Sequence, residues 1–145
     1  MLVLFADPLS DLWYRHLYAW LQSRETRDEI EEPMTTTITD EQIQQLAASA
    51  KPYSVAILHW GPQRHMDGAA AIELEHQRRM VTLRADGVIA ILTPVVSDTV
   101  AGIAIMTVTP EKAKEIMDGD PCVQAQMMHC EVHPCLSFPG DTLPA

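Results

Sequence analysis

The spacing of hydrophobic residues changes near residue 51. In the first fifty residues, apolar positions recur every three or four residues, which is typical of one face of a helix. Asp7-Pro8 is a suitable helix start, since Asp accepts from free backbone N–H groups and Pro fits the first helical position. Thr39 and Gln42 have capping-box spacing before a second, shorter helix. We therefore expect residues 1–51 to form a two-helix extension; its first apolar stripe is Leu9, Leu12, Trp13, His16, Leu17, Trp20 and Leu21.

The pattern in residues 52–137 predicts a separate α+β domain. Apolar, β-rich runs indicate strands at 53–60, 87–96, 99–108 and 125–133, and helical stripes lie between them at 68–86 and from Pro110 to Gly119. The order β-α-β-β-α-β is the ferredoxin-like arrangement, in which the first and third strands are central. The nearly continuous apolar run 53–60 is typical of a strand covered on both faces. The Pro/Gly-rich residues 138–145 are expected to form a loose tail.

The second strand of that arrangement poses a problem for a monomer. It is expected at an edge of the sheet, yet the run Val88–Leu92 has no polar face. A bare apolar edge invites pairing with another chain. We therefore expect a second subunit or the amino-terminal helices to cover it, and predict a homodimer or a larger homo-oligomer.

Charge and composition narrow the classes of partner. The 145 residues carry 20 acidic and 10 basic side chains, a net charge of -10. This balance argues against nucleic acid and against an anionic membrane surface, because both need a positive face. No apolar run reaches the roughly 20 residues that span a bilayer, and the amino terminus lacks the basic region of a secretory signal. The three cysteines are expected to be reduced thiols in a cytoplasmic protein.

His76 and Asp120 are the strongest candidates for chemistry. His76 falls on the inward stripe of the long helix, where Leu or Ile is usual, and Asp120 follows the turn that ends the second helix. Because both helices of this topology lie on one side of the sheet, the two side chains are expected to converge. A His with a carboxylate partner is suited to proton transfer near neutral pH. Two structural alternatives remain: a core histidine with a satisfied hydrogen bond, and an Asp120-Pro121 pair that caps a following turn.

The segment 53–135 resembles the YciI-like (YCII-related) proteins of the dimeric α+β barrel superfamily. The resemblance rests on a strand, a helix with His76 eleven residues before Gly87, a hairpin, a further helix, and Asp120-Pro121-Cys122-Val123 before the last strand. It implies a His76–Asp120 acid/base dyad, a dimer, and lyase, isomerase or dehydrohalogenase-like chemistry on a cyclic or aromatic compound without an organic cofactor. The chain departs from the pattern at Thr93-Pro94, where Gly-Pro is usual, and at Cys122, where an aromatic residue is usual.

The segment HCEVHPC, residues 129–135, is a second candidate site. On a strand, His129, Glu131 and His133 share one face, and Met128, Cys130 and Val132 take the other. Two imidazoles and a carboxylate about 6.6 Å apart along a strand suit Zn²⁺ or another ion that favours imidazole. Polar residues on the solvent face of an edge strand also need no ligand to explain them.

Three further residues are candidates for binding a substrate. His59 ends the first strand, where it would line the mouth of a pocket, and Cys122 adjoins Asp120. Arg79 belongs to a small basic patch with Arg64, His65 and Arg78, which suits a carboxylate-bearing substrate. A core or rim position, a buried thiol and a solvated helix face are the structural alternatives. The sequence thus predicts a small-molecule enzyme, with a non-catalytic ligand- or metal-binding module or interaction subunit as the alternative.

Overall fold

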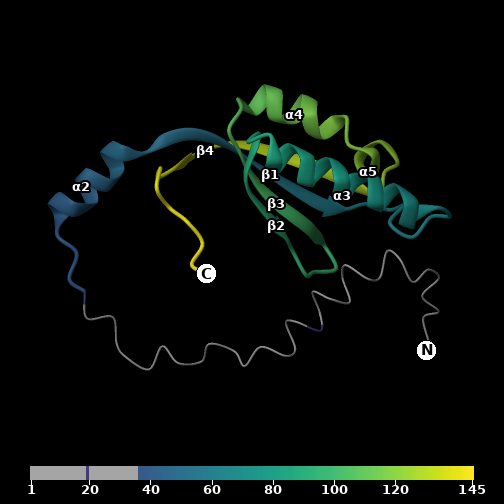
Figure 1. Ribbon diagram of the computed structural model, residues 1–145, viewed down its shortest axis with the longest axis horizontal. Helices are drawn as coiled ribbons and strands as arrows, with labels where there is room; N and C mark the ends of the chain where they lie inside the picture. The colour runs from purple at the N-terminus through teal and green to yellow at the C-terminus, as the bar shows by residue number, and fades with distance from the viewer. Residues whose placement is uncertain (1–18, 20–35) are drawn as a thin grey trace.

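The computed structural model describes residues 36–145 and Ala19. Its elements are α2 (Asp40–Ser49), β1 (Lys51–Trp60), α3 (Ala69–Ala85), β2 (Ile89–Pro94), β3 (Val100–Met106), α4 (Pro110–Asp118), α5 (Pro121–Gln124) and β4 (Met128–Ser137) (Figure 1). The expected helix after Asp7-Pro8, and any docking of it, lie outside the described residues.

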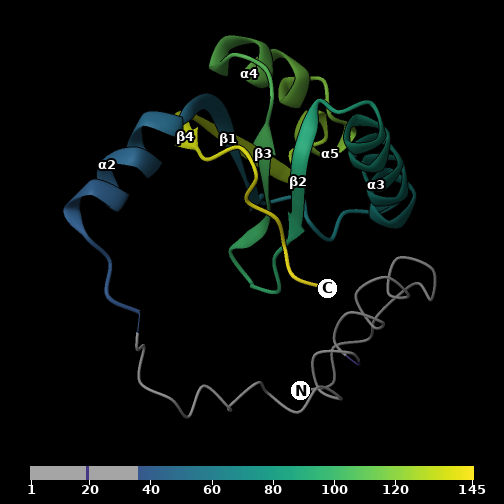
Figure 2. The same cartoon turned by 60° about the vertical axis from the view of Figure 1, so that its left-hand side comes forward.

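A four-stranded antiparallel sheet organises residues 51–137. Its strand order is β2-β3-β1-β4, so β1 and β3 are central and β2 and β4 are the edges. Helices α3, α4 and α5 lie along one side of this sheet (Figure 2). Helix α3 contacts β2, while α4 contacts β1 and β4. The chain is therefore an α+β protein, and the helix-bearing side of the sheet carries its core.

The core fills the layer between the helices and the sheet. One cluster joins buried residues of β1, β2 and β3 to α3 and α4, and a second joins β1, β3 and β4 to α5. Small side chains on the sheet let large methionines from the helices pack closely, with Ala56 and Ala104 beneath Met80 and Met117. The polar Ser54 is also fully buried, and its hydroxyl donates to the carbonyl of Val108 at 2.7 Å.

The outer face of the sheet differs from the sequence expectation. The run 53–60 predicted burial on both faces, but only one side of β1 is fully buried, at Ser54, Ala56 and Leu58. Val55 and Ile57 on the opposite side are half-buried, as are Ile103 and Ile105 of β3. The reason is architectural: the described helices cover one face of the sheet and leave an aliphatic outer face.

Local capping explains where the helices begin and end. Thr39 and Gln42 form the expected capping box of α2. Helix α3 ends with Gly87 at φ +75°, and the N–H of Val88 donates to the Leu83 carbonyl at 2.9 Å, as in a Schellman motif. Gly87 thus ends the helix, which is why β2 starts at Ile89 rather than at 87. Thr109 accepts from the N–H of Lys112, so α4 begins at Pro110 as expected.

The last strand begins later than its sequence pattern indicated. Residues 125–127, expected in the strand, instead follow the short helix α5, and Gln126 adopts a left-handed conformation at φ 59°. The strand then continues to Ser137, four residues beyond the expected end. The later start has a local cause. Asp120 caps the short helix α5, and this helix with its C-cap Ala125 occupies the segment directly before the strand.

Helix α2 has no buried residue. Its apolar positions Ile43 and Leu46 are 57% and 51% exposed, so the expected apolar stripe exists without a partner in the described part of the chain. Among the described residues, no helix is long and apolar enough to cross a membrane.

Candidate active site

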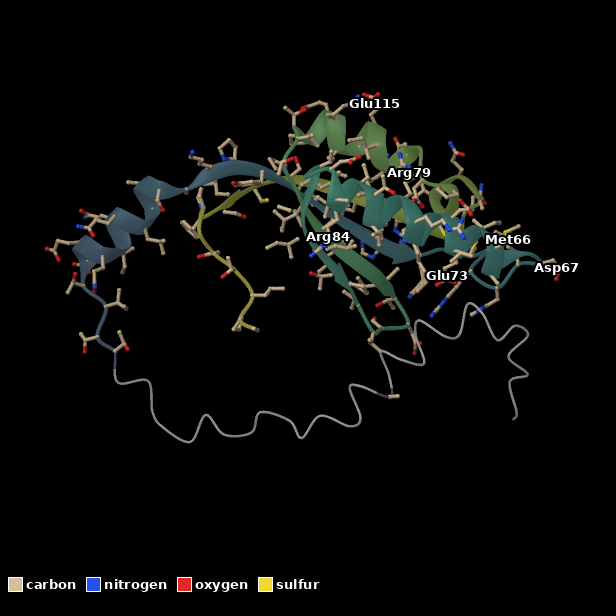
Figure 3. All side chains as sticks on the ribbon, viewed as in Figure 1. Met66, Asp67, Glu73, Arg79, Arg84 and Glu115 are labelled. Carbon is tan, nitrogen blue, oxygen red and sulfur yellow. The ribbon has the colours of Figure 1, made fainter. Side chains whose placement is uncertain are left out.

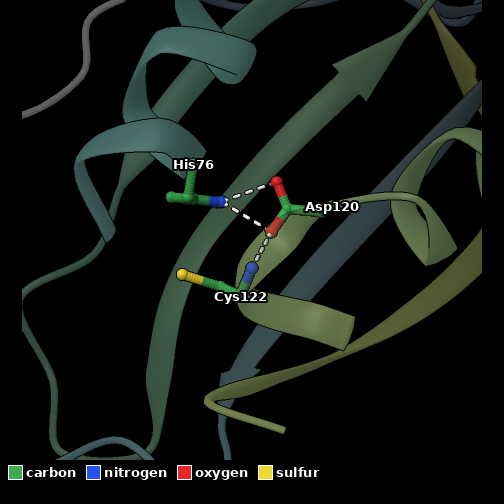
Figure 4. Close-up of side chains that lie close together, drawn as sticks. All are labelled: His76, Asp120 and Cys122. Atoms are coloured by element: carbon green, nitrogen blue, oxygen red, sulfur yellow. Dashed lines mark hydrogen bonds and ion pairs between the residues drawn. The ribbon is translucent and has the colours of Figure 1, made fainter. Parts of the chain in front are cut away.

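His76 and Asp120 are in direct contact, as the sequence predicted. The Nδ1 atom of His76 lies 2.9 Å from each carboxylate oxygen of Asp120 (Figure 4). The His76 side chain is 11% exposed and that of Asp120 is 0% exposed. The pair is therefore shielded from water on the carboxylate side and open only at the imidazole.

The backbone fixes Asp120 in place. Asp120 is the N-cap of α5, and its Oδ1 accepts from the N–H of Cys122 at 2.9 Å and from that of Val123 at 3.4 Å. The structural alternative for Asp120-Pro121 is thus confirmed, and it coexists with the contact to His76. One carboxylate starts a helix and holds an imidazole.

The contact also sets the protonation pattern of the imidazole. A carboxylate oxygen accepts hydrogen bonds, so Nδ1 of His76 carries the proton in this contact. In the neutral ring the other nitrogen, Nε2, is then left with a lone pair. This is the tautomer that a general base needs, with the carboxylate ready to stabilise the charged ring.

His76 borders a cavity of about 520 Å³ between α3 and the sheet. The wall is mostly apolar, formed by α3 on one side and by β2 and β3 on the other. Its polar side chains are those of Glu73, Gln77, Arg78 and Thr82 of α3 and Thr93 of β2. Figure 3 shows Glu73 on the side of α3 that faces away from α4, and Arg79 on the side towards it. The cavity therefore places one imidazole, hydrogen-bonded to a carboxylate, in a mostly apolar space with a few polar side chains.

Cys122 lies beside the dyad and is fully buried. Burial raises the pKa of its thiol to about 12, and the negative charges of Asp120 and Glu73 act in the same direction. His76, Asp120 and Cys122 offer donor atoms within 4.8 Å of one another, the one such group among the described residues. The raised pKa keeps a neutral thiol beside the hydrogen-bonded pair near neutral pH.

Of the three expected substrate-binding residues, none borders the cavity. Cys122 lies beside the dyad and does not line the cavity. Arg79 reaches towards the end of α4, where its Nη2 atom would lie 3.2 Å from a Cβ placed on Gly119. His59 points to the outer face of the sheet. Arg78, the neighbour of Arg79, borders the cavity, but its guanidinium pairs with Glu75 at 3.3 Å and its side chain is 67% exposed.

The face of β4 predicted to carry His129, Glu131 and His133 exists as expected, and all three residues are exposed. Glu131 accepts from two imidazoles at once: His59 Nε2 lies 2.9 Å from Oε2, and His133 Nε2 lies 2.5 Å from Oε1. These contacts lower the pKa of Glu131. His59 belongs to this cluster, an assignment that the sequence analysis missed because it depends on the register of β1 against β4.

Comparison of the chain with protein-family models and with curated proteins finds no match.

Proposed function

We propose that the protein is a small-molecule enzyme that uses the His76–Asp120 pair to move a proton. The observation that carries the proposal is the geometry of the pair. A fully buried carboxylate holds Nδ1 of an imidazole at 2.9 Å, and the same imidazole borders a cavity of about 520 Å³. The pair thus joins a held imidazole to a space that a small molecule can occupy.

In the proposed mechanism, His76 Nε2 takes a proton from an acidic carbon or a hydroxyl of the bound substrate. Asp120 keeps the imidazole oriented and stabilises the positive charge that the ring then carries. General base catalysis of this kind contributes typically about 10²–10⁴-fold to the rate. Return of the proton to another carbon of the substrate yields an isomerisation, whereas its transfer to a departing hydroxyl group yields an elimination in which that group leaves as water.

The cavity supports an apolar substrate with one or two polar groups. Leu58, Met80 and Leu92 contribute apolar surface, and Gln77 and Thr93 contribute polar groups that can meet a polar atom of the substrate. These features suit the cyclic or aromatic compounds that the YciI-like resemblance implies. The element order β1-α3-β2-β3-α4-β4 and the sheet order β2-β3-β1-β4 support a ferredoxin-like domain of that kind.

We also propose that the protein is a homodimer. The support is the aliphatic outer face of the sheet, which includes Val55, Ile57, Ile91, Ile103 and Ile105, all half-buried in the single chain. The nearly continuous apolar pattern of β1 is typical of a strand covered on both sides. A second copy that presents the same face would supply the missing layer.

Hydrogen–deuterium exchange tests the catalytic proposal without knowledge of the complete reaction. The protein is incubated in D₂O with a panel of cyclic and aromatic compounds that carry an acidic C–H bond, and ¹H NMR follows the loss of that signal. We expect catalysed exchange for part of the panel and a loss of about 10²–10⁴-fold in His76→Gln. His65→Gln, an exposed histidine outside the cavity, is the matched control. Binding without exchange would instead indicate a binding module.

A further inference from the structure

The outer face of the sheet holds a second group of chemistry-bearing residues, separate from the dyad. It consists of His59 on β1 and His129, Glu131 and His133 on β4; we call it the histidine cluster. His59 and His129 are direct partners across the two strands, and their rings stack with centroids 4.7 Å apart and planes 14° apart. The cluster lies on the face of the sheet opposite to the helices, so it shares no residue with the cavity.

Glu131 already gathers the imidazoles of the cluster. Its two oxygens each accept from one Nε2 atom, that of His59 at 2.9 Å and that of His133 at 2.5 Å. Imidazoles from two strands are thus held at the two oxygens of one carboxylate, although the donor atoms do not all lie within 4.8 Å of one another, so an ion would have to draw the rings together. The ring of His129 stacks on that of His59 and adds a further imidazole to the cluster.

We propose that the histidine cluster binds one divalent transition-metal ion of the zinc class. Imidazole and carboxylate are the ligands that Zn²⁺ takes in proteins, at about 2.0–2.2 Å. The metal would take the place of the two hydrogen bonds between Glu131 and the imidazoles. Each imidazole would then bind the ion through Nε2 and carry its proton on Nδ1. The ion would be held by His59, Glu131 and His133, with His129 completing the set.

The surroundings favour a cation at this place. In the single chain the exposed fractions of the His59, Glu131 and His133 side chains are 26%, 47% and 54%, so the rings have room to turn towards an ion. The backbone beneath them is rigid, because β1 and β4 pair along ten residues each. The chain's net charge of -10 adds a general attraction for cations.

Isothermal titration with Zn²⁺ at pH 7.5, on full-length protein without a histidine tag, tests the proposal. We expect one ion per chain and a rise in the melting temperature on addition of Zn²⁺. Single variants His59→Gln, Glu131→Gln and His133→Gln should each weaken binding by at least about tenfold, since loss of a group that merely orients a metal ligand costs about 10–100-fold. His65→Gln, another exposed histidine, should bind as the wild type does.

Histidine C2–H resonances provide a second measurement on the wild-type protein. Zn²⁺ should shift or broaden the signals of His59, His129 and His133 and leave that of His65 in place. The proposal is overturned if no ion binds at 1:1, or if the affinity survives all three cluster substitutions. It is also overturned if binding is lost in Cys122→Ala, because the ion would then sit at the dyad. Neither result bears on the exchange experiment, which depends on His76 alone.

Discussion

His76 of α3 and Asp120 at the start of α5 are 44 positions apart in the sequence, yet the imidazole Nδ1 and the carboxylate lie 2.9 Å apart. The contact joins two helices that both pack on the same side of the sheet. Asp120 also accepts from two backbone N–H groups of its own helix. The carboxylate therefore cannot turn away from His76 without the loss of the α5 cap, and this coupling holds the imidazole in one orientation.

The two roles of Asp120 can be separated by two substitutions. Asp120→Ala removes both the cap and the partner of His76, and leaves buried N–H groups without an acceptor, which costs about 1–3 kcal/mol. Asp120→Asn keeps an oxygen for the N–H of Cys122 but removes the charge. We expect urea unfolding to show a larger loss of stability for Ala than for Asn, while both variants lose catalysed exchange. Equal stability losses would contradict the capping role.

Stability is expected to fall in alkaline solution because of two thiols, that of the buried Cys122 and that of the half-buried Cys130. Burial raises the pKa of Cys122 from 9.0 to about 12 and that of Cys130 to about 11 in the folded chain. Between pH 9 and these values the unfolded chain releases thiol protons that the folded chain keeps, so deprotonation favours unfolding. The contribution of these protonated thiols to the free energy of unfolding is fully present below pH 9 and is lost as the pH rises towards 12.

Urea unfolding at pH 7.5, 9 and 10.5 measures this effect. The free energy of unfolding should decline from pH 9 upward in the wild type. The decline should be shallower in the Cys122→Ala, Cys130→Ala double variant, which retains every other titrating group. Parallel pH profiles for the two proteins would refute the assignment to these thiols.

Gly61 occupies a position that no larger residue fits. A Cβ placed there would lie 2.4 Å from the backbone oxygen of Gln126, and the Gly61 N–H donates to the Met127 carbonyl at 2.7 Å. Gly61→Ala must push apart the junction between β1 and β4, and we expect a cost at the upper end of the roughly 1–3 kcal/mol typical of overpacking. In Gly119→Ala the Cβ meets a flexible arginine side chain at 3.2 Å. Urea unfolding should therefore show this control to be much less affected.

Light scattering tests the proposed dimer. At micromolar concentration we expect a particle of twice the 16.2 kDa chain mass. Ile105→Glu places a charge on the outer sheet face and should shift the population to the monomer, whereas Leu136→Glu, at a position that is already 68% exposed, should not. A wild-type particle of one chain mass would contradict the proposal.

Local patterns in the sequence were sufficient for much of this fold. The stripe that contains His76 and Met80 predicted α3 and its inward face, and Gly87 marked its end. The Thr39–Gln42 capping box and the position of Pro110 indicated the starts of two further helices, because a helix start depends on residues only a few positions apart. The contact of His76 with Asp120 could be expected because a buried imidazole needs a partner.

What the sequence could not supply depends on register and on packing between distant segments. His59 was expected at a pocket mouth, but its pairing with His129 across β1 and β4 places it in the histidine cluster instead. Arg78 and Arg79 are neighbours in the sequence, and the rotation of about 100° per residue turns Arg79 towards α4 and Arg78 towards solvent, where it pairs with Glu75. The start of β4 was misplaced because α5 is only four residues long and leaves no periodic signal.

The pairing of β1 with β4 also determines how the α+β unit can be cut and rejoined. Lys51 and Ser137 are register partners, so the two ends of the unit lie side by side on adjacent strands. A short linker between them would close the backbone into a ring, and new termini could be opened in the hairpin loop between β2 and β3. Such a circular permutant would keep every strand neighbour of the original sheet, which makes this unit a natural candidate for insertion as a cassette into a loop of another protein.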